Sequence, residues 1–333
     1  MNYYCYVFII PILMISNLMI FISSSWISMW MIMEINLISF ISLIIFDKNM
    51  NKELYINYFL IQTFNSYLFL MASLLLEYNF IQNIITLMVL SMINKMGFPP
   101  FYYWYLKIMN NMNWINIFLM STVQKIIPLI ILSNMMNNKF SMLFTMIIMM
   151  FTSIYSSIKG LSQMNLKFIY CYSSMIQMSW VIILMIFNEM MMMNYLLIYF
   201  IISLSMCMVF NNYNINNLIN ISMLKFNNII IYYFMNFSIF SLASIPPMFG
   251  FMMKLMLMKE LFNLLPVLML IIMIMGSLIS MFFYLRLLFM NIMVNSFSNK
   301  INYKFINYNN NYNFKILFML WMMMVLLMSM ELF

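Results

Sequence analysis

The chain has 333 residues, of which 66% are hydrophobic and 7% are charged, and its formal net charge is +8 at neutral pH. With a mean hydropathy of +0.97, it has too few polar side chains to cover a soluble core. This composition excludes a soluble globular protein and indicates one that crosses a membrane several times.

Apolar stretches of about 20 residues, the length at which a helix crosses a hydrocarbon core, recur along the whole chain. We predict an all-α, polytopic membrane protein and no β-barrel, because runs such as residues 264–275 do not alternate polar and apolar side chains. Residues 101–113 are expected to be an interfacial connection, and residues 211–228 and 294–313 to be solvated loops. The expected spans, about eleven, are residues 3–22, 25–46, 57–76, 81–100, 114–134, 140–158, 167–187, 191–210, 229–261, 264–290 and 314–333.

The usage of amino acids points to a mitochondrial gene. Gly occurs four times and Met 49 times, while Ala is confined to Ala72 and Ala243 and Arg to Arg286. Residues with G/C-rich codons are thus depleted, and the excess of Met follows if AUA is read as Met. We therefore predict an A/T-rich mitochondrial genome and the inner membrane as the location. The alternative is that Met serves as a flexible lipid-facing side chain. No cleavable targeting segment is predicted, because the N-terminal apolar stretch lacks a basic flank.

Basic residues are distributed unequally among the predicted connections, which predicts the orientation. The odd-numbered connections contain Lys139 and Lys259. By the positive-inside rule the more basic, even-numbered connections face the matrix. We expect residues 1–333 to form a single transmembrane domain with its N-terminus on the matrix side and its C-terminus on the intermembrane-space side. The even-numbered connections contain Lys48, Lys52, Lys107, Lys159, Lys167, Lys225, Lys300, Lys304 and Lys315.

The residues that bind redox centres are scarce. The chain has no histidine and three widely separated cysteines, Cys5, Cys171 and Cys207. An iron–sulfur cluster usually needs four thiolates, and a bound nucleotide usually needs a glycine-rich loop. We expect no cofactor, metal ion or nucleic acid to be bound by this chain.

Four charged residues are expected within the membrane. Counted from the start of their spans, Glu34 lies about 14 Å deep and Lys125 about 17 Å deep. Such a group costs roughly 2.5–3.5 kcal/mol at a helix centre, so we expect it to face protein or water instead of lipid. Lys95 and Lys254 also lie in apolar stretches. The alternative for each lysine is that it extends to the headgroups or pairs with a carbonyl to fix helix packing.

Residues that interrupt helices lie beside these lysines. Proline removes an amide donor and clashes with the preceding turn, and the freed carbonyls are tolerated at depth only where protein or water satisfies them. Broken helices with ionisable neighbours build the midplane ion sites of carriers, although an ordinary proline kink is the alternative at each position. The expected helix breaks are at Gly97, Pro99, Pro100, Pro128, Pro246, Pro247 and Gly250.

Several motifs, taken together, resemble subunit 2 of NADH dehydrogenase, a family of mitochondrially encoded, antiporter-like membrane subunits of respiratory complex I. The resemblance covers residues 23–260 and implies antiporter-like inverted repeats, with the first three of the family's fourteen helices missing. The motifs are Ser23 to Trp26 with Trp30, Glu34 and Asn36; Lys95 to Trp104; Gln124, Lys125 and Pro128; Tyr172 to Ser174; and Pro246, Pro247, Gly250, Phe251 and Lys254.

The resemblance implies a proton-translocating subunit of NADH:ubiquinone oxidoreductase. Glu34 would pair with Lys95, Lys125 would be the central relay, and Lys254 would be the exit-side group. NADH, FMN, iron–sulfur clusters and ubiquinone would be bound by other subunits, and the partners would be other membrane and accessory subunits and phospholipids such as cardiolipin. Two other readings stay open: a free-standing cation/proton antiporter, and a structural subunit without its own proton path.

The chain departs from the family's pattern at a few positions. Gln177 and Ser179 stand where relatives usually have His and Gly, Val123 replaces a Trp, and Ser244 and Ile245 replace Gly and Leu. Without the histidine, a path of water or hydroxyl groups would have to replace one titratable group.

Overall fold

The computed structural model describes residues 2–46, 52–76, 81–136, 138–215, 229–246, 248–262 and 266–298. The regular structure in these ranges is helical and includes no strand, so the prediction of an all-α protein is confirmed. Contacts divide the chain into two compact units, Met1–Thr152 and Ser153–Phe333.

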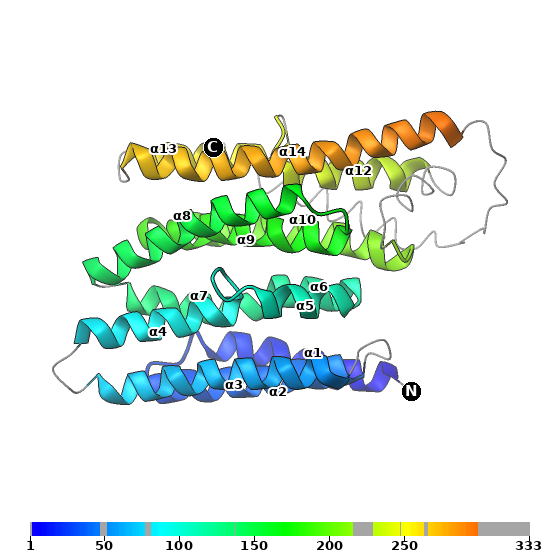
Figure 1. Cartoon of the computed structure of the whole chain (residues 1–333). Helices are drawn as coiled ribbons and strands as arrows, with labels where there is room; N and C mark the ends of the chain where they lie inside the picture. Colours follow the sequence, from blue (N-terminus) through cyan, green and yellow to red (C-terminus); the bar gives the residue numbers. More distant parts are fainter. Residues whose placement is uncertain are drawn as a thin grey trace. The chain divides into compact units, whose positions relative to one another are not determined.

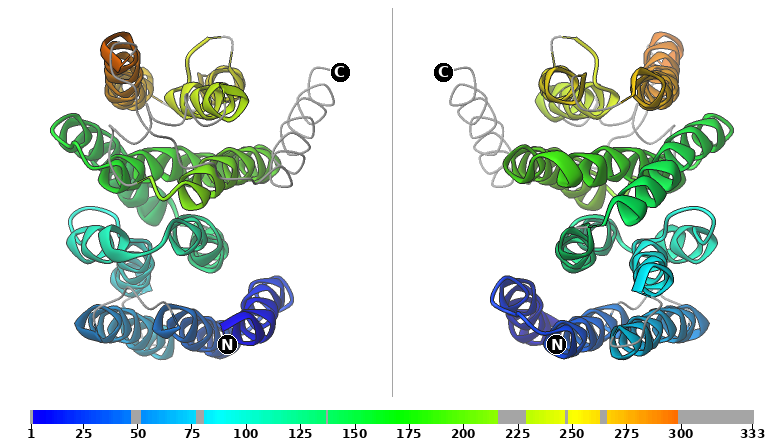
Figure 2. Two further views of the ribbon diagram at one scale, coloured as in Figure 1. Left: turned by 90° about the vertical axis from the view of Figure 1, so that its right-hand side faces the viewer. Right: turned by 90° about the vertical axis from the view of Figure 1, so that its left-hand side faces the viewer.

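The first unit is built from two rows of helices (Figures 1 and 2). α1, α2 and α3 lie side by side, and α7 contacts α1, α2 and α4. The packing therefore surrounds α7 with α1, α2 and α4, in addition to α6, which precedes it in the chain. The helices are α1 (Asn2–Met19), α2 (Trp26–Ile45), α3 (Lys52–Leu75), α4 (Ile81–Met96), α5 (Tyr103–Asn111), α6 (Trp114–Ser121) and α7 (Val123–Met135). α8 (Lys139–Leu161) begins in this unit and ends in the second.

The second unit is arranged around α9, which is buried along almost its whole length. Within the unit α9 contacts α10, α13 and α14, and α12 contacts α10, α13 and α14. The helices are α9 (Leu166–Phe187), α10 (Glu189–Asn212), α12 (Ile229–Ala243), α13 (Phe249–Phe262) and α14 (Val267–Ser298).

Hydroxyl side chains inside the apolar helices satisfy their hydrogen bonds locally. Ser16, Ser91 and Ser238 each donate to the carbonyl three residues earlier, at 2.8, 2.6 and 2.7 Å. Helix starts use side chains as well: the Ser25 hydroxyl accepts the amide of Ser28 at 3.2 Å at the start of α2. These bonds let a chain with many serines form helices where no water competes.

In the part of the chain that the structure describes, seven helical stretches are long and apolar enough to cross a membrane. The multi-pass class is thereby confirmed. Two expected spans are interrupted: residues 114–134 form α6 and α7, and residues 229–261 form α12 and α13. The expected connection at 101–113 contains a helix, α5. The expected span 314–333 lies outside the described residues, and the orientation stays a prediction.

Candidate functional site

Helix α4 ends at a tight turn directly after Lys95. The amide of Gly97 donates to the carbonyl of Asn94 at 3.1 Å, and the amide of Phe98 donates to that of Ile93 at 3.3 Å. Gly97 has φ of +75°, and a Cβ atom there would lie 2.7 Å from the Cβ of Tyr105. Only glycine therefore fits at this helix end, which brings Phe98 and α5 close to the last turn of α4.

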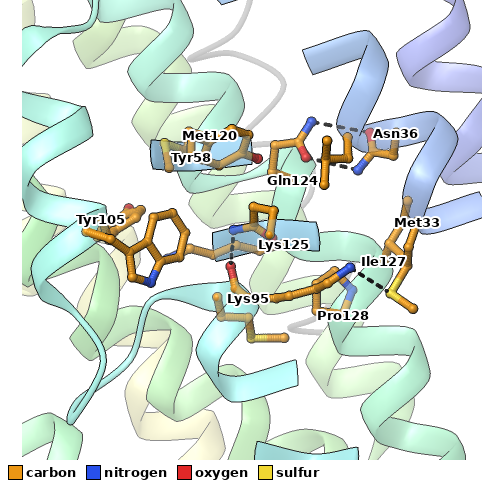
Figure 3. A pocket seen from close by; sticks show the side chains of 14 residues that line it. Met33, Asn36, Tyr58, Lys95, Tyr105, Met120, Gln124, Lys125, Ile127 and Pro128 are labelled. Atoms are coloured by element: carbon orange, nitrogen blue, oxygen red, sulfur yellow. Dashed lines mark hydrogen bonds between the residues drawn. The ribbon is translucent and has the colours of Figure 1, made fainter. Parts of the chain in front are cut away.

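The ammonium group of Lys95 is buried between helices. Lys95 is 9% exposed, and its Nζ donates to the sulfur of Met33 on α2 at 3.3 Å (Figure 3). Its backbone carbonyl accepts a hydrogen bond of 3.2 Å from the amide of Gln62 on α3. Lys95 is therefore fixed at both its side chain and its backbone.

Glu34 lies one residue after Met33 on α2 and is half-buried. Its carboxylate accepts a hydrogen bond from the hydroxyl of Ser66 on α3. The structure thus holds Glu34 and Lys95 through different partners, Ser66 and Met33. Their direct pairing, which the family resemblance implies, remains a proposal.

Lys125 lies directly after an interruption between α6 and α7. Thr122 leaves the helical conformation, with φ of −121° and ψ of −73°, and its hydroxyl donates to the carbonyl of Phe118 at 2.6 Å. Lys125 is the third residue of α7 and is 2% exposed. Its Nζ lies 4.8 Å from the ring centroid of Tyr105 and 5.5 Å from that of Phe98, distances at which aromatic rings attract a cation.

The interpretation of Pro128 as a helix break is wrong. α7 continues from Val123 to Met135 through Pro128, and the interruption lies earlier, at Thr122. Pro128 falls in the second turn of α7, where the only amide bond it removes is the one to the carbonyl of Gln124. The loss of one bond is tolerated there, whereas Thr122 ends α6 outright.

A cavity lies between Lys95 and Lys125, the two buried lysines described above (Figure 3). The space open to the centre of a water molecule is about 30 Å³, which holds about two waters. Two ammonium groups thus share one small space with amide and phenol groups. The side chains with polar atoms that line it are Asn36, Tyr58, Gln62, Lys95, Trp104, Tyr105, Gln124 and Lys125.

Two polar contacts at this cavity had no predicted role. The amides of Asn36 and Gln124 bond each other at 2.9 and 3.2 Å and so join α2 to α7, as Figure 3 shows. Gln62 bonds the carbonyl of Lys95. One sign of these contacts is visible in the sequence: amide side chains occur inside apolar spans, where each needs a hydrogen-bond partner.

The second unit places Lys254 in α13. Lys254 is 6% exposed, and its Nζ has no hydrogen-bond partner among the described residues. Before it, α12 ends at Ala243, and Ser244, with φ of +56°, forms a turn before Pro246. Pro247 lies outside the described residues. Gly250 lies inside α13, not in the break itself.

Gly250 allows α13 to approach the end of α12 closely. A Cβ atom at this position would overlap the carbonyl oxygen of Ser241. Beside this contact lies a cavity of about 20 Å³, counted as the space open to the centre of a water molecule, enough for about one water. It is lined by Gln177, Tyr195, Ser241, Gly250 and Met253, among others.

Gln177 connects three helices at this second cavity. Its amide nitrogen donates to the carbonyl of Leu242 at 3.3 Å, and its amide oxygen accepts a hydrogen bond from the phenol of Tyr195. α9, α10 and the end of α12 are thereby joined. Within the described residues no group of three or more His, Cys, Asp or Glu could hold a metal ion.

Interrupted membrane helices with buried lysines are typical of membrane proteins that carry ions. Comparisons with known proteins give the family. Residues 75–280 match the model of the family described as NADH:quinone oxidoreductase/Mrp antiporter, transmembrane. The chain belongs to this family.

Relatives of this chain carry one name. NADH-ubiquinone oxidoreductase chain 2 of Aedes aegypti is 34% identical over 314 residues, which cover 90% of this chain and 89% of that protein. The protein of that name from Anopheles gambiae is 32% identical over 301 residues, 86% of each chain. The resemblance expected from the sequence motifs is confirmed.

Solved structures show the same fold. A chain of respiratory complex I from Thermus thermophilus, with bound aureothin, matches with a TM-score of 0.70 at 16% identity and covers 81% of this chain and 70% of that one. A chain of the Mrp complex from a Dietzia species matches with a TM-score of 0.72 at 12% identity, covering 84% of this chain and 59% of that one. The family match confirms the predicted antiporter-like class, and these structures show its fold.

Proposed function

We propose that this chain is a proton-translocating membrane subunit of NADH:ubiquinone oxidoreductase in the mitochondrial inner membrane. Its relatives named NADH-ubiquinone oxidoreductase chain 2, which match most of the chain, support this assignment. The redox reaction takes place in other subunits, which bind NADH, FMN, iron–sulfur clusters and ubiquinone. Those membrane and accessory subunits, together with phospholipids such as cardiolipin, are the partners of this chain.

One observation supports the proton path more than any other: Lys95 and Lys125 line one cavity with room for about two waters. Both lysines are buried, and each lines the same small space, so a water there can take a proton from one amine and give it to the other. Water in this cavity connects the two amines. Lys95 and Lys125 then exchange a proton without exposing either charge to lipid.

Glu34 controls the first of these lysines. Its hydrogen bond from Ser66 holds the carboxylate in one position, while Lys95 bonds Met33 on the same helix. A redox-driven shift of Glu34 towards Lys95 stabilises the protonated amine, and a shift back favours release. Lys254, buried in the second unit, is the exit-side group.

Replacement of Lys125 by methionine tests this path. Lys125→Met in the assembled complex removes the central amine, so we expect NADH oxidation to fall at least about tenfold, or to lose part of its coupled proton translocation. Lys107→Met is the matched control, because Lys107 is an exposed lysine on α5. An assembled Lys125→Met complex with normal turnover and normal protons per electron would show that Lys125 is not the relay.

A free-standing cation/proton antiporter is the second candidate, because the description of the matching family also names Mrp antiporters and a chain of an Mrp complex shares the fold. Native electrophoresis of the extracted chain separates the two. Co-migration with NADH-oxidising, quinone-reducing activity supports the subunit, whereas migration alone, with exchange of Na⁺ or K⁺ for protons in liposomes, supports the antiporter.

The third candidate is a structural subunit without its own proton path, and its expected outcome differs from the other two. In that case every lysine substitution that impairs activity also impairs assembly, and no assembled complex is uncoupled.

A further inference from the structure

The ends of α4 and α12 are built in the same way. In α4 the amides of Gly97 and Phe98 donate to the carbonyls of Asn94 and Ile93 at 3.1 and 3.3 Å. In α12 the amides of Ser244 and Ile245 donate to Ser241 and Phe240 at 3.2 and 3.3 Å. Gly97 and Ser244 are both left-handed, with φ of +75° and +56°. Each helix therefore ends in a Schellman motif.

In both motifs the helix end leaves the carbonyl of the penultimate residue without its helical donor, and a proline follows at the same distance. In a continuous helix the carbonyl of residue i accepts the amide of residue i+4. For Lys95 that residue is Pro99 and for Leu242 it is Pro246, and proline has no amide hydrogen. A buried carbonyl without a partner is costly where water is excluded.

A glutamine from a neighbouring helix donates to each of these carbonyls. Gln62 on α3 bonds the carbonyl of Lys95 at 3.2 Å, and Gln177 on α9 bonds the carbonyl of Leu242 at 3.3 Å. Both glutamines are buried, at 6% and 7% exposure. The phenol of Tyr195 donates to the amide oxygen of Gln177, so the nitrogen is the atom that faces Leu242.

We propose that Gln62 and Gln177 are equivalent positioning residues, each of which caps a carbonyl that the helix end leaves free and the following proline cannot satisfy, and thereby fixes a helix break. The first cap acts directly on Lys95, because the capped carbonyl belongs to that residue. The second fixes the end of α12 against α13, whose Gly250 and Met253 line the cavity beside Gln177. The consequence for proton movement rests on the proposed function, whereas the caps themselves do not.

Hydrogen–deuterium exchange of the assembled complex, followed by mass spectrometry, measures each cap separately. Gln62→Met removes the first donor and should speed exchange at residues 97–101 about tenfold, with no change at residues 244–252. Gln177→Met should speed exchange at residues 244–252 about tenfold, with no change at residues 97–101. Gln163→Met is the matched control, because among the described residues the side-chain amide of Gln163 donates to the hydroxyl of its neighbour Ser162 and to no carbonyl at a helix end.

Gln177→His is the rescue variant. Its ring N–H restores a donor towards Leu242, so exchange at residues 244–252 should return to within about threefold of the wild type. The proposal fails if Gln62→Met and Gln177→Met exchange like Gln163→Met, if both breaks loosen together in either variant, or if Gln177→His exchanges as fast as Gln177→Met.

If Gln177→Met does not assemble, Tyr195→Phe tests the second cap. This variant keeps the donor but releases the amide oxygen, so exchange should rise about threefold at residues 244–252 and stay constant at residues 97–101. Unchanged exchange at residues 244–252 would overturn the assignment of Gln177.

Proton stoichiometry separates the caps from the proposed function. Gln62→Met should lower protons translocated per electron, because Lys95 loses the bond that fixes its backbone. Faster exchange at residues 97–101 with normal stoichiometry would uphold the cap and contradict the role of Lys95 in proton transfer.

Discussion

Asn36 and Gln124 show at the scale of single residues how polar groups stabilise this membrane protein. Their reciprocal bonds of 2.9 and 3.2 Å satisfy one donor and one acceptor of each amide. Ser16 of α1 also donates to Asn36, at 3.5 Å. The pair fixes the start of α7 one residue before Lys125, so it determines where that ammonium lies.

We predict that Asn36→Leu destabilises the chain by about 1–3 kcal/mol, because Gln124 is left with unsatisfied polar atoms away from water. The double variant Asn36→Leu with Gln124→Leu should recover part of this loss, since both polar partners are then absent. A double-mutant cycle on thermal unfolding in detergent measures the coupling. Additive single effects would show that the two amides do not depend on each other.

Ser244 carries backbone strain that a glycine would remove. Its φ of +56° lies in the left-handed region, and its buried hydroxyl has no hydrogen-bond partner among the described residues. We predict that Ser244→Gly stabilises the chain by about 1 kcal/mol, measured as a higher midpoint of thermal unfolding in detergent. Ser241→Gly is the control: Ser241 lies inside α12, where glycine should destabilise by about 1 kcal/mol. Equal shifts in both variants would contradict the prediction.

At the scale of helices, the carbonyl groups at a helix end need hydrogen-bond partners as much as those in its interior do. Arg286 on α14 illustrates this: its guanidinium donates to the carbonyl of Leu161 and, at 2.7 Å, to that of Gln163. In the structure this side chain caps the C-terminus of α8, where a positive charge also complements the helix dipole.

We predict that Arg286→Met loosens the end of α8, with a cost of about 1–3 kcal/mol for the lost charged hydrogen bonds. Arg286→Lys should recover only part of this, because an ammonium lacks the planar fork that reaches two carbonyls. Hydrogen exchange at residues 158–165 is the measurement, with Lys159→Met as the control at the same helix end. Full recovery by lysine would indicate that charge alone matters.

For the whole molecule, the distribution of lysines predicts which ends of the helices face the matrix. Lys107 and Lys159 belong to predicted matrix-side connections, and Lys139 and Lys259 to the opposite side. All four are exposed in the structure, so chemical labelling can report their side.

We predict that a membrane-impermeant amine reagent modifies Lys139 and Lys259 in mitoplasts, and Lys107 and Lys159 in inverted inner-membrane particles. Mass spectrometry reads the modified peptides, and solubilised complex, in which all four lysines are accessible, is the control. Labelling of Lys107 in mitoplasts would show that its connection faces the intermembrane space, contrary to the prediction.

The sequence by itself determined the helical membrane class, because apolar length and scarce charge leave few other solutions. It also singled out Lys95, Lys125 and Lys254, since a charge inside an apolar span is visible without a structure, but only the structure shows that all three are buried. The interruption at Thr122 was not predictable, because a single residue that leaves the helical conformation inside an apolar span has no signature in composition.

Only the tertiary structure decided what surrounds those lysines. It placed Phe98 and Tyr105 beside Lys125, and it placed Gln62 against the carbonyl of Lys95. The physical reason is that a hydrogen bond or a ring contact between distant segments depends on how helices pack. Helical periodicity shows which face of a helix is apolar, but it does not show which amide of a neighbouring helix lies within 3 to 4 Å of a freed carbonyl.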